Sequence, residues 1–366
     1  MKETDIPTPA LVIDVETATR NVKCLAEYAV AHRLKVRPHT KTHKSLRMAR
    51  LQLEHGAGGL AVAKAGEAKV MAQVCDDILI AYPTLDAHRC GAIGELAMAK
   101  SVNIVVAIDS VLAADRLAQA AQARGATVGI LVDFDTGMHR TGLQTAGQTV
   151  ELARHVERVE GLRLDGLMVY QGNITGNKAH VIDALHKVSD CMQQVLDTWK
   201  EHGLEAKIVS GGSTPNACLC HHVPQLTEIR PGTYIYYDRN SLALKNCTIN
   251  DCAARIVATV VSQAVPGKVV LDCGNKTLTS DLLVGSDRSA GFGLIVEYPD
   301  AVIDQATEEH GRVDIGKCDN PPTLGERVHV IPNHICPAVN LQNNVWFKDG
   351  DGQVEKAPVD ARGLLS

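Results

Sequence analysis

The sequence predicts an α/β protein in which a (β/α)8 barrel of the TIM type is followed by a second, mostly β domain. The chain has 366 residues, which suits a barrel of ~250 residues plus a smaller module. From residue 35 to residue 237, apolar β-rich runs alternate with amphipathic, Ala-rich segments, and this alternation indicates a parallel sheet. After Asp238, short strand-like runs follow one another without a long amphipathic helix between them.

Eight barrel strands are expected, and eight strand–helix units favour a closed barrel over an open doubly wound sheet. Residues 111–124 and 179–202 carry apolar side chains at helical spacing. In such barrels the chemistry lies at the C-terminal ends of the strands. The strands are expected to start near Lys35, Leu60, Ile78, Asn103, Val128, Asp165, Lys207 and Gly232.

The predicted domain boundary follows the change of pattern after Asp238. We expect a barrel domain at residues 16–238 and a β domain at residues 239–366, which the N-terminal segment 1–15 joins. The opening strand, residues 9–14, is expected to pair with the β domain. Further β-domain strands are expected at residues 257–264, 268–272, 293–296 and 327–331.

Composition and charge argue against several function classes. Aromatic residues make up only 3% of the chain, which argues against surfaces that stack bases or sugars. The net charge is −5 and no long basic run occurs, so neither nucleic acid nor a membrane is an expected partner. The polar N-terminus lacks the apolar core of a signal peptide. The 11 cysteines show no framework spacing, which favours reduced thiols and a cytoplasmic location.

The basic stretch at residues 37–44, Arg-Pro-His-Thr-Lys-Thr-His-Lys, follows the first expected barrel strand. A lysine at a strand end can form an imine with a carbonyl cofactor if its geometry is fixed and its pKa is lowered by desolvation or nearby positive charge. Arg37, His39, His43 and Lys44 crowd Lys41 in this way. A solvated basic loop is the alternative interpretation, but the strand-end position favours Lys41 as the reactive residue.

Three further strand ends carry residues suited to the same kind of site. The Ser-Gly-Gly-Ser-Thr-Pro turn at residues 210–215 follows the seventh expected strand, where such barrels commonly bind phosphate, although such a turn is more often only a tight turn. Arg140, after the fifth strand, could donate to a phenolate oxygen or instead pair with Asp133 or Asp135. Tyr170 ends the sixth strand and could pack beside a bound ring or simply fill the barrel rim.

Near the C-terminus, His334 and Cys336 stand two residues apart, so on an extended strand both would point to the same side. Imidazole and thiolate ligands favour Zn²⁺, and two protein ligands leave positions open for water or substrate. A buried histidine beside an inert cysteine is the alternative. A rival metal cluster with denser ligands, which we take to be packing or surface residues, consists of Cys218, Cys220, His221 and His222.

Taken in order, these segments resemble the fold-type III pyridoxal-phosphate (PLP) enzymes, the alanine-racemase-like barrel group. Within that group the chain is similar to the D-threonine aldolase/D-serine dehydratase family, and the similarity runs nearly from end to end. The segments that carry it are Thr8-Pro9-Ala10, the Pro-His-x-Lys motif ending at Lys41, Asp-x-Gly-Met-x-Arg at 135–140, the turn at 210–215, and residues 228–234, 272–276, 308–311 and 334–336.

The resemblance implies a role for each matching residue. Lys41 would form the imine with PLP, Arg140 would hydrogen-bond its phenolate oxygen and Tyr170 would lie beside its ring. His334 and Cys336 would bind a divalent metal (Zn²⁺ or Mn²⁺, with Mg²⁺ as a further option) in a pocket shared with PLP. The family is usually dimeric, so a homodimer is expected. The phosphate would be held by Gly212, Ser213, Thr214 and Tyr234, with Tyr236 on the same strand able to share the role.

The resemblance leaves the reaction open between two branches. The aldolase branch typically has His-x-Asp with Mn²⁺ or Mg²⁺, whereas the dehydratase branch typically has His-x-Cys with Zn²⁺, as Cys336 suggests. The segments at 337–341, 347–350 and 361–363 resemble the aldolase tail, and we favour a D-threonine aldolase-like lyase that cleaves D-3-hydroxy amino acids. A D-serine or D-3-hydroxyaspartate dehydratase is the alternative. An amino-acid racemase and a non-catalytic PLP carrier are further hypotheses, neither of which would need a metal.

Overall fold

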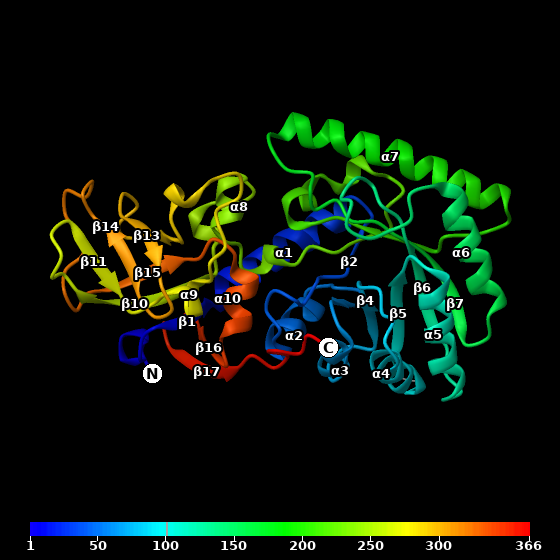
Figure 1. Ribbon diagram of the computed structural model, residues 1–366, viewed down its shortest axis with the longest axis horizontal. Helices are drawn as coiled ribbons and strands as arrows, with labels where there is room; N and C mark the ends of the chain where they lie inside the picture. Colours follow the sequence, from blue (N-terminus) through cyan, green and yellow to red (C-terminus); the bar gives the residue numbers. More distant parts are fainter. Residues whose placement is uncertain (100–101) are drawn as a thin grey trace. The chain divides into compact units, whose positions relative to one another are not determined.

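The computed structural model describes residues 1–99 and 102–366 (Figure 1). These residues form two compact units, which we call the β unit and the barrel unit. The predicted boundary between residues 238 and 239 stays a prediction. The β unit comprises Met1–Val22, Thr42–Ser45 and Thr233–Gly363, and the barrel unit comprises Lys23–Lys41, Leu46–Gly232 and Leu364–Ser366.

The barrel unit contains the expected eight parallel strands, joined in the order β2-β9-β8-β7-β6-β5-β4-β3. Two parallel bridges, between Val36 and Ala57 and between His39 and Ala61, bring the two ends of this sheet together. The predicted barrel is therefore confirmed. Its strands are β2 (Lys35–Val36), β3 (Leu60–Val62), β4 (Asp77–Ile80), β5 (Asn103–Ile108), β6 (Val128–Asp133), β7 (Leu162–Met168), β8 (Ile208–Gly211) and β9 (Glu228–Ile229).

The last barrel strand is not where the sequence predicted it. We expected it to start near Gly232, but β9 is Glu228–Ile229. Beyond β9, the Arg230 N–H still donates to the Gly211 carbonyl and the Pro231 carbonyl accepts the His39 N–H. Pro231 has no N–H of its own to donate to a neighbouring strand. The residues that follow, Thr233–Ile235, form the 3-10 turn η3. The expected start of the sixth strand near Asp165 was also late, since β7 begins at Leu162.

Helices connect the barrel strands, and Figure 1 shows α4, α5 and α6 beside β4 to β7. The predicted helices at 111–124 and 179–202 are confirmed as α5 and α7. A buried apolar cluster from five neighbouring strands, Ala61, Leu79, Val105, Ala107, Leu131 and Met168, fills the middle of the sheet. The helices are α1 (Val15–Ala31), α2 (Leu46–Glu54), α3 (Ala65–Met71), α4 (Ala87–Met98), α5 (Val111–Gln122), α6 (Ala146–Arg158) and α7 (Lys178–Glu201).

A register shift interrupts the pairing of β6 with β7. Leu164 pairs with Ile130 and Gly166 pairs with Leu131, so Asp165 is left over as an extra residue. Gly166 has a φ of +145°, and a Cβ at this position would lie 2.0 Å from the Ile208 carbonyl oxygen of β8. Only glycine fits here, because any side chain would overlap the neighbouring strand.

The β unit is built on a nine-stranded sheet in the order β11-β14-β13-β12-β15-β10-β1-β16-β17. The predicted opening strand is confirmed, because β1 pairs antiparallel with β10 and parallel with β16. Four strands, β13, β14, β16 and β17, were not predicted. The strands are β1 (Ala10–Asp14), β10 (Ala254–Ser262), β11 (Lys268–Leu271), β12 (Leu294–Ile295), β13 (Val302–Ala306), β14 (Gly311–Asp314), β15 (Arg327–Ile331), β16 (Asn344–Lys348) and β17 (Val354–Pro358).

Beyond this sheet, the β unit contains the first part of α1 and three short helices: α8 (Arg239–Ala243), α9 (Asn275–Leu278) and α10 (Ile335–Leu341). Its 3-10 segments are η1 (Glu3–Asp5), η3 (Thr233–Ile235), η4 (Ile249–Asp251) and η5 (Arg288–Ala290), whereas η2 (Thr214–His222) belongs to the barrel unit. Among the helices of residues 1–99 and 102–366, none has the length and apolar character needed to cross a membrane.

Candidate functional site

Lys41 lies in the loop after β2, at the C-terminal rim of the barrel unit. Main-chain hydrogen bonds fix this loop, since the His39 N–H donates to the Pro231 carbonyl at 3.0 Å and the Thr40 N–H to the Ala61 carbonyl at 2.8 Å. The Lys41 Nζ lies 6.0 Å from the centroid of the Tyr170 ring. Within the part of the chain that the structure describes, the Lys41 ammonium makes no hydrogen bond or ion pair, which leaves it open to react.

The other basic side chains of this motif are held by partners. The Arg37 guanidinium bonds both carboxylate oxygens of Glu228 at 2.9 Å and also the Asp77 carboxylate. In the β unit, the Lys44 Nζ donates to the Asn340 side chain at 2.9 Å. The structure thus singles out Lys41 from its basic neighbours.

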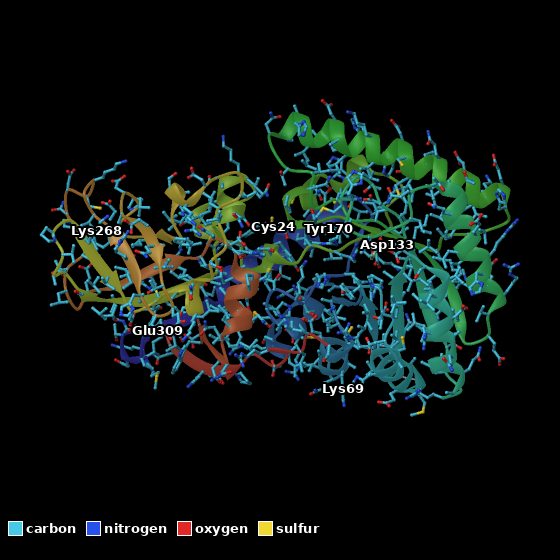
Figure 2. The ribbon with its side chains drawn as sticks, viewed as in Figure 1. Cys24, Lys69, Asp133, Tyr170, Lys268 and Glu309 are labelled. Atoms are coloured by element: carbon cyan, nitrogen blue, oxygen red, sulfur yellow. The ribbon has the colours of Figure 1, made fainter. Side chains whose placement is uncertain are left out.

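Tyr170 and Arg140 are brought together at this rim. The Arg140 guanidinium carbon lies 4.6 Å from the Tyr170 ring centroid, so the cation stacks on the ring face. Tyr170 comes just after β7, and Gly172 makes room for it, because a Cβ there would lie 2.3 Å from the ring. Figure 2 labels Tyr170 together with Asp133, and both belong to the barrel unit.

Asp133 ends β6 and lines a small hollow with Arg140, Thr141 and Tyr170. Burial raises the pKa of Asp133 to about 6, although a hydrogen bond from the Thr141 hydroxyl opposes the shift. A strand-end carboxyl group with such a pKa can exchange protons near neutral pH. In the sequence, Asp133 could be recognised only as a partner for Arg140, because this property depends on burial.

The turn after β8 is the expected phosphate segment, and the structure shows how its N–H groups are used. The Gly212 N–H donates to Gln171 Oε1 at 2.7 Å, and the Ser213 N–H donates to Asn216 Oδ1 at 3.0 Å. Gly212 has a φ of +77°, and a Cβ there would lie 3.0 Å from the Cys220 sulfur. Both amides are therefore engaged inside the protein, which the sequence analysis did not foresee.

Gln171 was missed by the sequence analysis and is the group best suited to a phosphate at this turn. Its side chain is 1% exposed, and among the described residues its Nε2 has no hydrogen-bond partner. That nitrogen faces Gly211, where it would lie 3.1 Å from an added Cβ. A buried donor without an acceptor is costly, and a phosphate oxygen at the 210–214 turn would satisfy it. The barrel unit therefore fits the phosphate group of PLP.

Tyr234 and Tyr236 are placed differently from the prediction. We expected both on one strand, but Tyr234 lies in the 3-10 turn η3 and Tyr236 just after it, because Pro231 has no N–H with which to continue the strand pairing. Both rings are buried, with 2% and 0% exposure, and belong to the β unit. The strand argument for a shared role of Tyr236 is therefore wrong, and the phosphate role of Tyr234 stays a prediction.

His334 and Cys336 are brought together in the β unit, but not on an extended strand as predicted. His334 is the extended N-cap residue of α10, and Cys336 lies in the first turn of that helix. The change of backbone direction at the helix start brings the imidazole and the thiol into a hydrogen bond. The Thr42 and Thr233 hydroxyl groups lie 3.2 and 3.6 Å from the Cys336 sulfur, within hydrogen-bonding reach.

Two carboxylates complete this cluster, and local sequence gave no signal for either. The Asp281 carboxylate lies 2.9 Å from His334 Nδ1, which leaves Nε2 available to a metal ion. Asp238 is buried and accepts the Ile335 N–H at 3.2 Å. Burial lowers the pKa of His334. The hydrogen bond with Cys336 and its charge, the charge of Asp238 and the hydrogen bond with Asp281 outweigh that effect and raise the pKa to about 9. A metal ion would have to displace that proton.

Metal clusters with more ligands do not occur in the described residues: no group of three or more His, Cys, Asp or Glu side chains can hold a metal ion. The rival cluster lies in η2, where the Cys220 thiol is buried and its pKa is raised to about 12 by that burial. A protonated thiol is a poor ligand, which supports treating Cys220 as a packing residue. His334 and Cys336 remain a two-residue donor set with open positions for water or substrate.

Two protein-family comparisons cover most of the chain. The family described as "Alanine racemase, N-terminal domain" matches residues 13–240. The chain belongs to this family. A second family, described as "Putative serine dehydratase domain", matches residues 253–347. The alanine-racemase-like resemblance of the sequence is thereby confirmed, together with the fold expected for these PLP enzymes.

Individual relatives of this alanine-racemase-like chain cover it almost completely. The D-threonine aldolase of Arthrobacter sp is 27% identical over 98% of this chain and 93% of its own length. The D-threo-3-hydroxyaspartate dehydratase of Delftia sp. (strain HT23) is 28% identical over 90% and 91%. The crystal structure of D-threonine aldolase from Filomicrobium marinum, 27% identical, superimposes with a TM-score of 0.92 and covers 100% of this chain and 98% of that one.

Variants of the Delftia dehydratase have also been solved. They include a cysteine-to-alanine mutant in the metal-free form and a histidine-to-alanine mutant, and the two substituted positions stand two residues apart in that protein. His334 and Cys336 have the same spacing in this chain.

Proposed function

We propose that this chain is a PLP- and divalent-metal-dependent lyase that acts on D-3-hydroxy amino acids. The observation that carries the proposal is a pair of sites. One is Lys41 at the rim of an alanine-racemase-like barrel, whose ammonium has no hydrogen bond or ion pair among the described residues. The other is the His334–Cys336 donor pair held by Asp281. A racemase or a PLP carrier would have no use for the second site. When bound, PLP withdraws electrons from the bonds at the substrate α-carbon.

In this proposal the chain's own residues bind and orient the reactants. Lys41 would form the covalent link to PLP and would move the proton at the substrate α-carbon. Arg140 would donate to the phenolate oxygen and Tyr170 would lie against the ring. The phosphate would be held by Gly212, Ser213, Thr214 and Tyr234, with Gln171 Nε2 as an added donor.

His334 Nε2 and the Cys336 sulfur would hold the metal ion, which lowers the pKa of the substrate β-hydroxyl group. A thiolate ligand favours Zn²⁺ over Mn²⁺ or Mg²⁺. Retro-aldol cleavage breaks the Cα–Cβ bond, and D-threonine then yields glycine and acetaldehyde. We favour this reaction because D-threonine aldolases are similar to the chain over nearly its whole length.

The dehydratase reaction is the second candidate, and a specific observation favours it. The solved Delftia dehydratase variants replace a histidine and a cysteine that stand two residues apart in that protein. His334 and Cys336 have the same spacing in this chain. In β-elimination the α-proton and the β-hydroxyl group leave, and D-serine yields pyruvate and ammonia. Because both reactions use the same donors, only the products can separate them.

The test is a product assay on purified chain reconstituted with PLP and with Zn²⁺ or Mn²⁺. D-Threonine and D-serine are supplied separately, and glycine, 2-oxobutanoate, pyruvate and ammonia are quantified. Glycine with acetaldehyde supports the aldolase, whereas 2-oxobutanoate or pyruvate with ammonia supports the dehydratase. Turnover that persists in EDTA, or an equal rate on L-threonine, would contradict the metal-dependent D-specific lyase. Size-exclusion chromatography tests the homodimer we infer from the family.

A further inference from the structure

Four imidazole rings gather on the barrel unit, apart from the Lys41 and His334–Cys336 sites. His32 follows directly after α1, His186 belongs to α7, and His221 and His222 end η2. The rings of His32 and His221 stack with centroids 4.2 Å apart, and those of His221 and His222 lie 4.3 Å apart. The sequence analysis noticed only the η2 members of this cluster.

Two nitrogens in the cluster are spaced as ligands of one metal ion would be. His186 Nε2 and His222 Nδ1 lie 3.2 Å apart. Two Zn–N bonds of ~2.0–2.1 Å at a tetrahedral angle place their nitrogens ~3.3–3.4 Å apart. This is close to the separation of the hydrogen-bonded pair, whose shared proton a metal ion would replace as the rings turn towards it. His186 is exposed on α7, and its side chain can make that rotation.

The surroundings hold the His222 ring in place. Its neighbour His221 is fixed at two points, because the His221 Nδ1 lies 2.8 Å from the Tyr28 hydroxyl and the same hydroxyl accepts the His221 main-chain N–H at 3.0 Å. The fixed His221 ring packs against His222, with ring centroids 4.3 Å apart, and limits how that ring can turn.

We propose that His186 and His222 form a two-histidine site for a borderline transition-metal ion of the Zn²⁺, Ni²⁺ or Cu²⁺ class. Water fills the remaining positions, because the described residues contain no group of three or more His, Cys, Asp or Glu ligands. Imidazole nitrogens suit these ions rather than Mg²⁺ or Ca²⁺. The site is separate from the His334–Cys336 pair and does not depend on the proposed lyase activity.

Metal stoichiometry tests this inference directly. Untagged protein is dialysed to equilibrium against micromolar Zn²⁺ at pH 7.5, and bound zinc per chain is measured by elemental analysis. His186→Gln and His222→Gln should each lose one equivalent of zinc relative to wild type. The matched control is His180→Gln, an exposed histidine of the same helix α7, and it should keep the wild-type stoichiometry.

A His334→Ala background separates this site from the proposed catalytic one. That variant should still lose one equivalent when His186 is replaced, whether or not the His334–Cys336 site binds zinc. Circular dichroism confirms that each variant is folded. If folded His186→Gln and His222→Gln bind as much zinc as the wild type and as His180→Gln, the two-histidine site does not exist.

Discussion

At the scale of the residue, hydrogen bonding separates Lys41 from the basic side chains around it. Arg37 is committed to Glu228 and Asp77, and Lys44 to Asn340. Sequence alone could identify the basic cluster but could not show which cation is unpaired, because the partners come from residues 77, 228 and 340. The free amine at the barrel rim is thus a property of the fold.

Replacing Lys41 should remove the covalent link to PLP. We expect Lys41→Ala to abolish the imine absorption band and the borohydride-reducible pyridoxyl label, because no other amine has been placed beside Tyr170 in the described residues. Absorption spectra and peptide mass spectrometry after reduction measure both effects. Lys35→Ala, an exposed lysine of β2, is the control and should keep the label. A label that survives in Lys41→Ala would assign the anchor to another lysine.

Asp281 should tune the affinity of the metal site without touching the metal itself. Its carboxylate bonds His334 Nδ1 at 2.9 Å, and loss of such an orienting group typically lowers metal affinity by about 10–100-fold. Titration calorimetry of Asp281→Ala with Zn²⁺ measures this change. Asp300→Ala, an exposed carboxylate of the same unit, should bind zinc as the wild type does. Unchanged affinity in Asp281→Ala would reduce that contact to a surface ion pair.

At the scale of the element, continuous apolar runs made the barrel predictable. Parallel strands that are buried on both faces, such as β5 and β6, consist almost entirely of apolar residues. The strands of the β unit that were not predicted contain both apolar and polar residues: β13 has the sequence VIDQA and β17 the sequence VEKAP. Their polar residues resemble loop sequence, and cross-strand pairing rather than composition makes them strands.

The site was predictable in its residue types but not in its geometry. The Lys41, Arg140 and Tyr170 cluster follows from strand ends that converge in any barrel of this kind. The His334–Cys336 pair was found, but its helix-start geometry and its Asp281 partner were not, because Asp281 is distant in sequence and lies outside the named strands and helices. Gln171 and Asp133 matter through burial, which single-sequence patterns report poorly.

The register shift between β6 and β7 should be sensitive to one methyl group. Gly166→Ala would place a Cβ 2.0 Å from the Ile208 carbonyl oxygen, and the main chain of β7 or β8 would have to move. We expect a loss of at least about 2 kcal/mol in the free energy of unfolding, measured by urea denaturation. Gly203 has a φ of +74°, and an added Cβ there would have nothing within 4 Å. Gly203→Ala should therefore lower the free energy of unfolding by only about 1 kcal/mol.

A histidine between two glutamates should make the β unit pH-sensitive. His329 of β15 bonds Glu297 and Glu3, and these bonds raise its pKa from 6.5 to about 9. The hydrogen bond with His329 lowers the pKa of Glu3 from 4.5 to about 2. The stability that His329 adds to the β unit is therefore complete below pH 6.5 and disappears as the pH rises through about 9. The stability that Glu3 adds is complete above pH 4.5 and disappears as the pH falls towards 2.

His329→Gln should flatten this dependence. We expect the wild type to lose about 1–2 kcal/mol of unfolding free energy between pH 6.5 and pH 9.5 through this group, after allowance for solvent screening. The variant should lose correspondingly less. Urea unfolding curves across this range measure the difference, and parallel pH profiles for the two proteins would show that the ion cluster contributes nothing to stability.

At the scale of the whole molecule, the β unit is assembled from segments far apart in the chain. β1 lies inside the nine-stranded sheet, between β10 and β16, so it is a central strand rather than an edge. Its residues Ala10 to Ile13 pair with Val257 to Ala254, and Val12 to Asp14 pair with Trp346 to Lys348. Loss of this one strand would expose two neighbours at once.

Removal of residues 1–14 should therefore prevent the β unit from folding. Leu11 and Ile13 are each 1% exposed, and the truncated chain would leave the ladder edges of β10 and β16 without partners. We expect insoluble protein, or protein without a cooperative unfolding transition, as judged by solubility and near-ultraviolet circular dichroism. Truncation of residues 1–2 alone, which leaves β1 intact, is the control and should remain soluble. A soluble, cooperatively folded product lacking 1–14 would show that β1 is dispensable.

The central place of β1 also determines when the β unit can fold during synthesis at the ribosome. β1 ends at Asp14, but its first partner begins at Ala254. Because translation adds ~5–20 residues per second, the nascent strand waits on the order of tens of seconds before that partner emerges. During this interval the sequence ALVID is an apolar strand with two open edges, the kind of segment that holding chaperones bind. Most barrel strands pair with a strand that follows within a few tens of residues, whereas β2 shares the long wait because its partner is β9 (Glu228–Ile229).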